Sequence, residues 1–263
     1  MTAASASRTI ERAVAALEPV ALEELTAAAA LLTRVDRKYA LAADDAARML
    51  AALPEGTRAL EIAGERALAY ASTYFDSGDL LAYRLAAHGR RRRFKLRTRT
   101  YVDANLAFLE LKTRGGRGTT VKERIAYAPE DRAVLTEDGR AYAEEGLAVV
   151  GIPAPPLRPV IETAYRRTTL LLPDGATRAT VDTDLAWRLD DGTTLRTPGL
   201  VIVETKATGG PGSVDRLLWR AGHRPDRVSK FATGLAALRP DLPANRWHGV
   251  LRRCFADAER TAA

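Results

Sequence analysis

The sequence predicts an α+β fold in which an antiparallel sheet dominates. Two observations lead to this prediction. Extended segments near 90–102, 105–114 and 118–128 follow one another closely, separated by a two-residue turn at 103–104 and a glycine-rich turn at 114–118. Connections this short favour hairpins over crossover units. Segments with helical spacing lie before, between and after the strands, so we expect helices to flank the sheet.

The N-terminal region, residues 1–32, is predicted to be a short helical arm. Pro19 interrupts it, because proline cannot donate the backbone hydrogen bond that a helix interior needs. Alternation then predicts a strand at 33–41, and apolar residues at helical spacing predict a helix at 43–53. We expect residues 33–258 to form one domain.

The same patterns predict the remaining elements. Further strands are expected at 57–62, 67–77, 160–172, 176–190 and 199–207. Helices are expected at 78–88, 130–146, 213–222 and 227–238, with a last segment at 245–258. The Pro-rich stretch 152–159 is a candidate linker between halves of the fold, and Pro173-Asp174-Gly175 predicts a turn. The total is about eight or nine strands.

Composition narrows the class of protein. The net charge of +7 favours acidic partners, and the single cysteine, Cys254, excludes an internal disulfide framework. No apolar run approaches the roughly 20 residues that span a bilayer. Arg8, Glu11 and Arg12 lie where a signal peptide would need its apolar stretch. We therefore expect a cytoplasmic protein.

Every second residue from Arg91 to Arg99 is basic. Side chains alternate between faces in an extended strand, so these five cations are expected on one face, with Phe94 and Leu96 on the other. Such a row repels itself unless an anion lies along it. A polyanion is therefore the first candidate for a ligand.

Strand 176–190 separates its side chains most clearly. The expected charged face carries Arg178, Thr180, Asp182 and Asp184. The expected apolar face carries Ala179, Val181, Leu185 and Trp187. Because successive side chains point to opposite faces, the apolar set is predicted to pack against a core.

Other predicted strands repeat this separation. For any single strand, a charged face is explained by exposure of one side of an antiparallel sheet to solvent. Across the set, however, the charged faces are mostly cationic, and a few carboxylates recur at matching depths: Asp36, Glu110, Asp182 and Glu204. Enclosed like charges need partners. Arg and Lys bind phosphoryl oxygens, and carboxylates hold Mg²⁺ or Mn²⁺ that bridges to phosphates.

A series of segments adds a family resemblance. The segments are RVDRKY (34–39), STYFDSGDLLAY (72–83), FKLRTRTY (94–101), LELKT (109–113), VKERI (121–125), PVIETAYRRT (159–168), RATVDTDL (178–185), VIVETK (201–206) and VSKF (228–231). In this order they resemble the VTC domain, the polyphosphate polymerase branch of the triphosphate tunnel metalloenzymes. The resemblance implies a roughly eight-stranded antiparallel β tunnel barrel with flanking helices and a basic lumen.

The resemblance also implies roles for residues in the tunnel. Residues similar to catalytic positions are Lys38, Arg97, Arg99, Lys112, Arg167 and Lys206, with Arg167 preferred to Arg166. Residues similar to phosphate-binding positions are Arg34, Lys95, Lys122, Arg124, Arg178 and Lys230. Glu204 resembles the metal-binding glutamate, and Glu110 and Asp182 are further candidates to hold Mn²⁺ or Mg²⁺.

The implied activity is transfer of the terminal phosphate of a nucleoside triphosphate to a chain of inorganic polyphosphate. Such transfer requires mainly alignment and charge neutralisation, so no nucleophilic Ser or Cys is needed. Binding or hydrolysis of tri- or polyphosphate without polymerisation is an alternative that stays open. The departure at the first strand, where Arg34-x-Asp36-x-Lys38 stands in place of a glutamate-rich ExExK, fits the VTC branch best.

Two unrelated functions are also compatible with short motifs. Nucleases of the PD-(D/E)xK type need an aspartate followed on a later strand by ExK, and Asp184 with Glu204-Thr205-Lys206 has acceptable spacing. The triplet Glu110-Leu111-Lys112 repeats that pattern, so it is weakly specific. The nuclease fold also needs helices on both faces of its sheet, which the one-sided charged strands do not favour.

The second unrelated function is that of a non-enzymatic nucleic-acid binder. It would place exposed aromatic side chains among its cations, so that bases stack on them. The basic row at 91–99 has none on its charged face, and Phe94, Phe108 and Trp187 are expected on non-cationic faces or in weak positions. We therefore expect no nucleic-acid partner.

Overall fold

The computed structural model describes residues 3–27, 34–114 and 120–262. The glycine-rich turn predicted at 114–118 therefore lies almost entirely outside the described residues. The strands are β1 (Glu18–Val20), β2 (Arg34–Ala42), β3 (Arg58–Leu60), β4 (Leu68–Ser77), β5 (Arg93–Tyr101), β6 (Leu106–Arg114), β7 (Thr120–Tyr127), β8 (Leu157–Leu171), β9 (Arg178–Leu189), β10 (Thr194–Arg196), β11 (Leu200–Thr208) and β12 (Glu259–Thr261). The α-helices are α1 (Ala3–Ala15), α2 (Leu22–Ala27), α3 (Ala43–Ala51), α4 (Leu81–Ala87), α5 (Glu137–Val149), α6 (Ser213–Arg220), α7 (Lys230–Leu238) and α8 (His248–Cys254).

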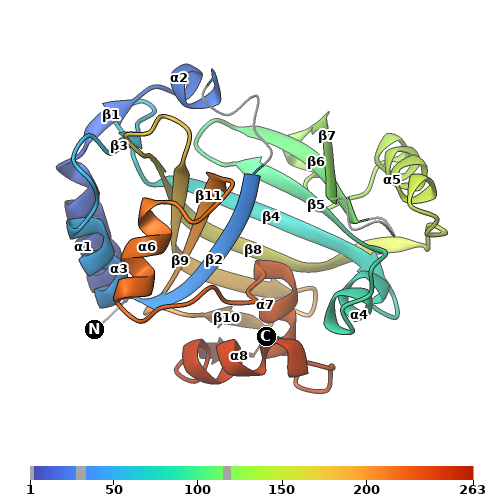
Figure 1. Cartoon of the computed structure of the whole chain (residues 1–263). Coiled ribbons are helices and arrows are strands. Elements are labelled where there is room, and N and C mark those ends of the chain that lie inside the picture. Colours follow the sequence, from blue (N-terminus) through green and yellow to red (C-terminus); the bar gives the residue numbers. More distant parts are fainter. Residues whose placement is uncertain (1–2, 28–33, 115–119, 263) are drawn as a thin grey trace.

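Eight long strands form one curved antiparallel sheet, in the order β2-β11-β9-β8-β4-β5-β6-β7. The predictions of an α+β class, antiparallel pairing and about eight strands are confirmed. The sheet is not closed, because no backbone pairing joins β2 to β7 within the described ranges. The predicted barrel is thus a strongly curved, open sheet, whose concave side lies between β2 and the β5-β6-β7 wall (Figure 1).

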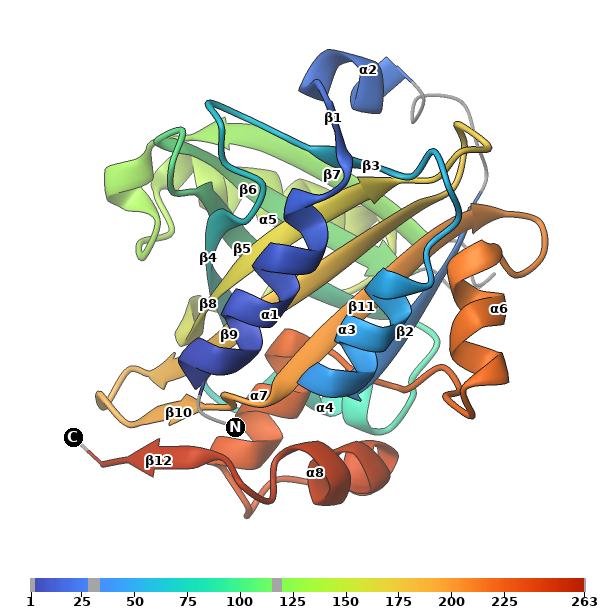
Figure 2. The same ribbon diagram turned by 90° about the vertical axis from the view of Figure 1, so that its left-hand side faces the viewer.

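Two apolar cores hold the helices on this sheet. The outer core packs α1, α3 and α6 against β2, β8, β9 and β11, and it contains Ile10, Val14, Met49 and Leu218. Figure 2 shows α1 and α3 lying across the outer face of β8, β9 and β11. The larger core joins the sheet to α4, α5, α7 and α8. None of the described helices is long and apolar enough to cross a membrane.

The N-terminal region is tied to the rest of the fold. The predicted break at Pro19 is confirmed, but Pro19 lies in the short strand β1, which pairs in parallel with β3. The guanidinium of Arg66 donates hydrogen bonds to three carbonyls at the end of α1, those of Val14, Ala15 and Leu17, at 2.7–3.0 Å. These bonds satisfy helix-end carbonyls that have no partner within the helix.

Several element boundaries differ from the sequence prediction, among them the starts of α5 and β8. The helix predicted at 130–146 begins at Glu137, because the hydroxyl of Thr136 caps it by accepting a hydrogen bond from the Gly139 amide at 3.2 Å. The predicted linker 152–159 is shorter, since β8 already begins at Leu157. Both differences leave the order of the elements unchanged.

The face assignment along β9 is wrong beyond Asp182. Asp184 has a left-handed φ of 52°, and the pairing of β8 with β9 shifts register between Ala164 and Arg166. A bulge of this kind reverses the alternation of side chains. Ala179 and Val181 therefore lie in the outer core, whereas Leu185 and Trp187 belong to the larger one.

Helix α7 packs over one end of the concave side. Its N-cap is Ser229, whose hydroxyl accepts a hydrogen bond from the Ala232 amide at 3.3 Å. Gly234 permits a close approach, because a Cβ there would lie 2.2 Å from the indole nitrogen of Trp187. The Trp187 indole N–H donates to the Lys230 carbonyl at 2.7 Å. These contacts place the start of α7 beside the charged strands.

Candidate functional site

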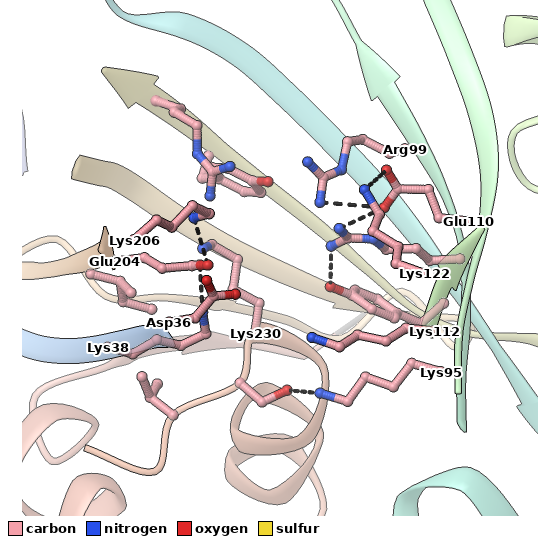
Figure 3. A pocket seen from close by; sticks show the side chains of 17 residues that line it. Asp36, Lys38, Lys95, Arg99, Glu110, Lys112, Lys122, Glu204, Lys206 and Lys230 are labelled. Atoms are coloured by element: carbon pink, nitrogen blue, oxygen red, sulfur yellow. Dashed lines mark hydrogen bonds and ion pairs between the residues drawn. The ribbon is translucent and has the colours of Figure 1, made fainter. Parts of the chain in front are cut away.

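The concave side of the sheet encloses a cavity of about 260 Å³. Its lining is mostly charged: Asp36, Lys38, Tyr74, Lys95, Arg97, Arg99, Glu110, Lys112, Lys122, Tyr165, Arg167, Ile202, Glu204, Lys206, Val228, Ser229 and Lys230. Figure 3 shows a wall from β2 and β11 facing a wall from β5, β6 and β7, with Lys230, at the start of α7, between them. The nine basic and three acidic side chains in the lining leave a surplus of six formal positive charges.

The cavity collects most of the residues predicted from the sequence. The six residues predicted as catalytic, Lys38, Arg97, Arg99, Lys112, Arg167 and Lys206, all line it. Of the predicted phosphate-binding residues, Lys95, Lys122 and Lys230 do so. The predicted metal-binding residues Glu204 and Glu110 also line it, while Asp182 lies directly behind Arg167 and Lys230.

One wall is organised around Glu110 on β6, which is 2% exposed. Arg97 donates to its carboxylate through Nε at 2.9 Å and Nη2 at 2.7 Å, and Lys122 Nζ lies 2.8 Å from the other oxygen. Arg99 Nη2 lies 3.4 Å away. Burial opposes ionisation, but Arg97 and Lys122 outweigh it and lower the pKa of Glu110. Glu110 thus stays ionised and orients three cations from neighbouring strands.

A second cluster of charges is organised around Asp182 on β9, which is fully buried. Arg167 binds it with two parallel hydrogen bonds, Nε to Oδ1 at 2.6 Å and Nη2 to Oδ2 at 2.8 Å, and Lys230 forms a further ion pair with Oδ2. Burial opposes ionisation, but Arg167 and Lys230 outweigh it and lower the pKa of Asp182 to about 2. Asp182 therefore holds two cations toward the cavity.

Glu204 on β11 is the third carboxylate, with 16% of its side chain exposed. Lys206 Nζ donates to Oε1 at 2.6 Å, and Lys38 forms an ion pair with Oε2. Burial opposes ionisation, but Lys38 and Lys206 outweigh it and lower the pKa of Glu204 well below its usual value. Asp36 is a diagonal neighbour of Glu204 on the same face, because Lys206 pairs with Asp36 and Glu204 with Lys38.

Lys95 lies near the start of α7. Its Nζ donates to the Ser229 hydroxyl at 2.7 Å, and it has no carboxylate partner among the described residues. Burial and the neighbouring charges of Lys112, Lys38 and Arg97 lower the pKa of Lys95 to about 7. Among the described residues, therefore, no anion of the cavity is paired with the cationic form of Lys95.

Two predicted phosphate-binding residues, Arg124 and Arg178, do not line the cavity. The guanidinium of Arg124 lies over the ring of Phe108, 4.4 Å from its centroid, and is exposed. Arg178 donates to the Leu25 carbonyl at 3.1 Å, beside α2. The side chain of Arg34 lies outside the described part of the chain.

Asp184, used for the nuclease hypothesis, does not join the cavity. Because of the bulge it accepts a hydrogen bond from the Ser7 hydroxyl on α1 at 2.5 Å, on the outer side. An aspartate that faces away from Glu204 and Lys206 does not provide the nuclease arrangement. The geometry therefore removes the support for that alternative.

Tyr74, Tyr165 and Ser229 also line the cavity, although none was predicted as a site residue. The hydroxyl of Tyr74 accepts a hydrogen bond from Arg97 Nη1 at 2.9 Å, and Tyr74 lines the cavity. The ring of Tyr165 lies 4.3 Å from Lys230 Nζ. Tyr165 could have been predicted from the alternation of side chains, because it shares a face with Arg167, two residues further along β8.

The carboxylates of the cavity differ in how well they suit a divalent metal. Glu110 and Asp182 each bind an Arg side chain, and no group of three His, Cys, Asp or Glu residues suited to a metal occurs in the described ranges. Mg²⁺ is commonly held by one or two carboxylates together with substrate phosphates. Glu204 with Asp36 on the adjacent strand fits that smaller donor set.

Comparison with known proteins gives one family match. The profile of the VTC domain matches residues 33–239. No curated protein matches the sequence.

Solved structures give more distant matches. A proposed adenylate cyclase from Bacillus halodurans is similar at 12% identity, a TM-score of 0.49, and coverage of 75% of this chain and 94% of that one. A proposed adenylyl cyclase from Hippeastrum, described as having a dominant triphosphatase activity, is similar at 15% identity, a TM-score of 0.48, and coverage of 81% and 100%.

Proposed function

Because the chain belongs to the VTC domain family, we propose that it transfers the terminal phosphoryl group of a nucleoside triphosphate to inorganic polyphosphate in the cavity. The observation that carries this proposal is the surplus of six positive charges around a cavity of about 260 Å³. A bound polyanion would offset a positive surplus of this kind. A phosphate chain provides that negative charge along its whole length.

The reaction needs two phosphate groups held in line. A terminal oxygen of polyphosphate attacks the γ-phosphorus, the bond from that phosphorus to the β,γ-bridging oxygen breaks, and the nucleoside diphosphate leaves. Cations positioned in advance stabilise the charge that spreads over the phosphoryl oxygens. Arg97, Arg99 and Arg167 are suited to grip oxygens through paired hydrogen bonds, while the lysines act as mobile point charges.

A divalent cation belongs to this proposal. Glu204, together with Asp36, would hold Mn²⁺ or Mg²⁺ at the β2-β11 wall. The bound metal would neutralise charge on the phosphates. Lys38 and Lys206 already pair with Glu204, so they would shift toward phosphate oxygens when a metal takes over the carboxylate.

The test is incubation of the protein with ATP, Mn²⁺ and a short polyphosphate primer, with polymer length and orthophosphate release measured together. We expect polymer growth. Orthophosphate release without growth would replace the transferase proposal by hydrolysis, and neither product would reject both. Glu204→Gln is expected to abolish turnover while polyphosphate binding persists, whereas Glu162→Gln, which removes an outer carboxylate paired with Arg188, serves as the control.

A further inference from the structure

Aromatic side chains continue the concave face beyond the cationic cavity. Alternation on β5 places Tyr101 on the same face as Arg97 and Arg99. The ring of Tyr101 lies 6.0 Å from that of Phe108 on β6, at 89°, and 5.1 Å from that of Tyr70 on β4. We call these three residues, Tyr70, Tyr101 and Phe108, the aromatic platform.

The platform is continuous with the cavity. Tyr70 stacks on the cavity-lining Tyr165 with a centroid distance of 5.4 Å and an angle of 12°. The guanidinium of Arg167 lies 5.2 Å from the centroids of both rings. A ligand bound at Arg167 and Arg99 therefore reaches the platform without leaving the protein surface.

The outer part of the platform is accessible. Tyr101 and Phe108 are half-buried, the adjacent Leu106 is 54% exposed, and Arg124 covers part of Phe108 with its guanidinium plane. Phe108 was expected on a non-cationic face or in a weak position, but it pairs with Arg99 in the register and faces Arg124. Aromatic rings and guanidinium planes are the two kinds of surface on which nucleobases stack.

Unused hydrogen-bonding capacity lies between the platform and the cavity. Within the described ranges, Arg99 Nε and the Ser72 hydroxyl are buried without a hydrogen-bond partner. Ser72 pairs with Arg99 in the register and precedes Tyr74 on the same face. Buried polar atoms of this kind call for a partner from water or a ligand.

We propose that the aromatic platform binds the base of a nucleoside triphosphate whose phosphates occupy the cavity. This inference rests on the proposed function and adds a binding site for the base of the nucleotide. A nucleoside triphosphate presents phosphates, then a sugar, then a base, and β5 presents Arg97, Arg99 and then Tyr101, about 6.6 Å further along the strand. Polyphosphate alone has no group that gains from an aromatic surface.

The test compares two ligands that share their phosphates. Calorimetry in the presence of Mn²⁺ measures the affinities for a non-hydrolysable ATP analogue and for inorganic triphosphate. Tyr101→Leu is expected to weaken binding of the nucleotide about tenfold, the scale of base stacking, and to change binding of triphosphate less than about twofold. Val121→Ala, on the exposed neighbouring strand β7, is the matched control.

A second variant separates loss of base binding from unfolding of the protein. Arg124→Gln removes the exposed guanidinium from the platform and leaves all three rings in place, and it should also weaken only the nucleotide. Equal weakening of both ligands, or no change in either, would overturn the platform while leaving the proposed function intact. If the wild-type protein binds triphosphate and the nucleotide equally well, the platform is likewise rejected. If it binds neither, both proposals fail.

Discussion

Protonation of Lys95 is expected to couple polyphosphate binding to pH. In the free protein, burial and the charges of Lys112, Lys38 and Arg97 lower the pKa of Lys95 to about 7. A bound phosphate chain supplies the missing anion and favours the cationic form. Affinity is then independent of this group below pH 7, where Lys95 is already protonated, and falls as pH rises above 7, because binding must take up a proton.

The size of the effect follows from the shift. If the bound anion restores an ordinary pKa near 10.5, affinity falls up to about tenfold per pH unit, hence by at most about 100-fold between pH 7 and pH 9. The assay is calorimetric titration of polyphosphate at several pH values, in two buffers of different ionisation enthalpy. The proton uptake of the wild type should exceed that of Lys95→Met at pH 8.

The comparison with Lys95→Met removes contributions from the ligand and from other lysines, which the two proteins share. Lys122→Met is the matched control, since it removes one cation of the cavity and keeps Lys95. If Lys95→Met retains the same decrease in affinity from pH 7 to pH 9 as the wild type, the reasoning about Lys95 is refuted.

Three further predictions concern the framework of the cavity. Asp182→Asn should lower the free energy of unfolding by about 3–5 kcal/mol in urea denaturation, because it leaves Arg167 and Lys230 buried without their anion; a loss below about 1 kcal/mol would contradict this role. Since the pKa of Asp182 is lowered to about 2, its stabilisation is present above about pH 4 and is lost as pH falls toward 2, so wild type and Asp182→Asn should converge in unfolding free energy over that window. A difference that persists at pH 2 would argue against it. Gly234→Ala should reduce both melting temperature and polyphosphate affinity, because the added Cβ meets Trp187 and displaces α7; unchanged values for both would show that α7 does not need this close approach.

Much of the cavity was predictable because strands obey a simple alternation. The charged row on β5 and its partners on β6 needed only parity, and Lys95, Arg97 and Arg99 indeed face the cavity. The prediction from alternation is wrong from Asp184 onward, because the left-handed backbone of Asp184 reverses which side chains of β9 point to each face of the sheet. No local feature of that segment predicts the bulge.

Other differences arise from tertiary contacts that a single strand does not reveal. Arg124 stacks on Phe108 and Arg178 reaches the Leu25 carbonyl, although both were predicted to bind phosphate. Pairing of carboxylates with arginines also depends on neighbouring strands. Asp182 and Glu110 therefore became anchors for cations in the structure, while their predicted role as metal ligands stays a prediction.

The most direct test of the central claim is an experimental structure of the protein with inorganic triphosphate and Mn²⁺. We expect the phosphates to lie between the Arg97-Arg99 wall and the Lys38-Lys206 wall, within reach of Arg167. Triphosphate bound elsewhere on the surface, with the cavity cations still paired only to Glu110, Asp182 and Glu204, would contradict it.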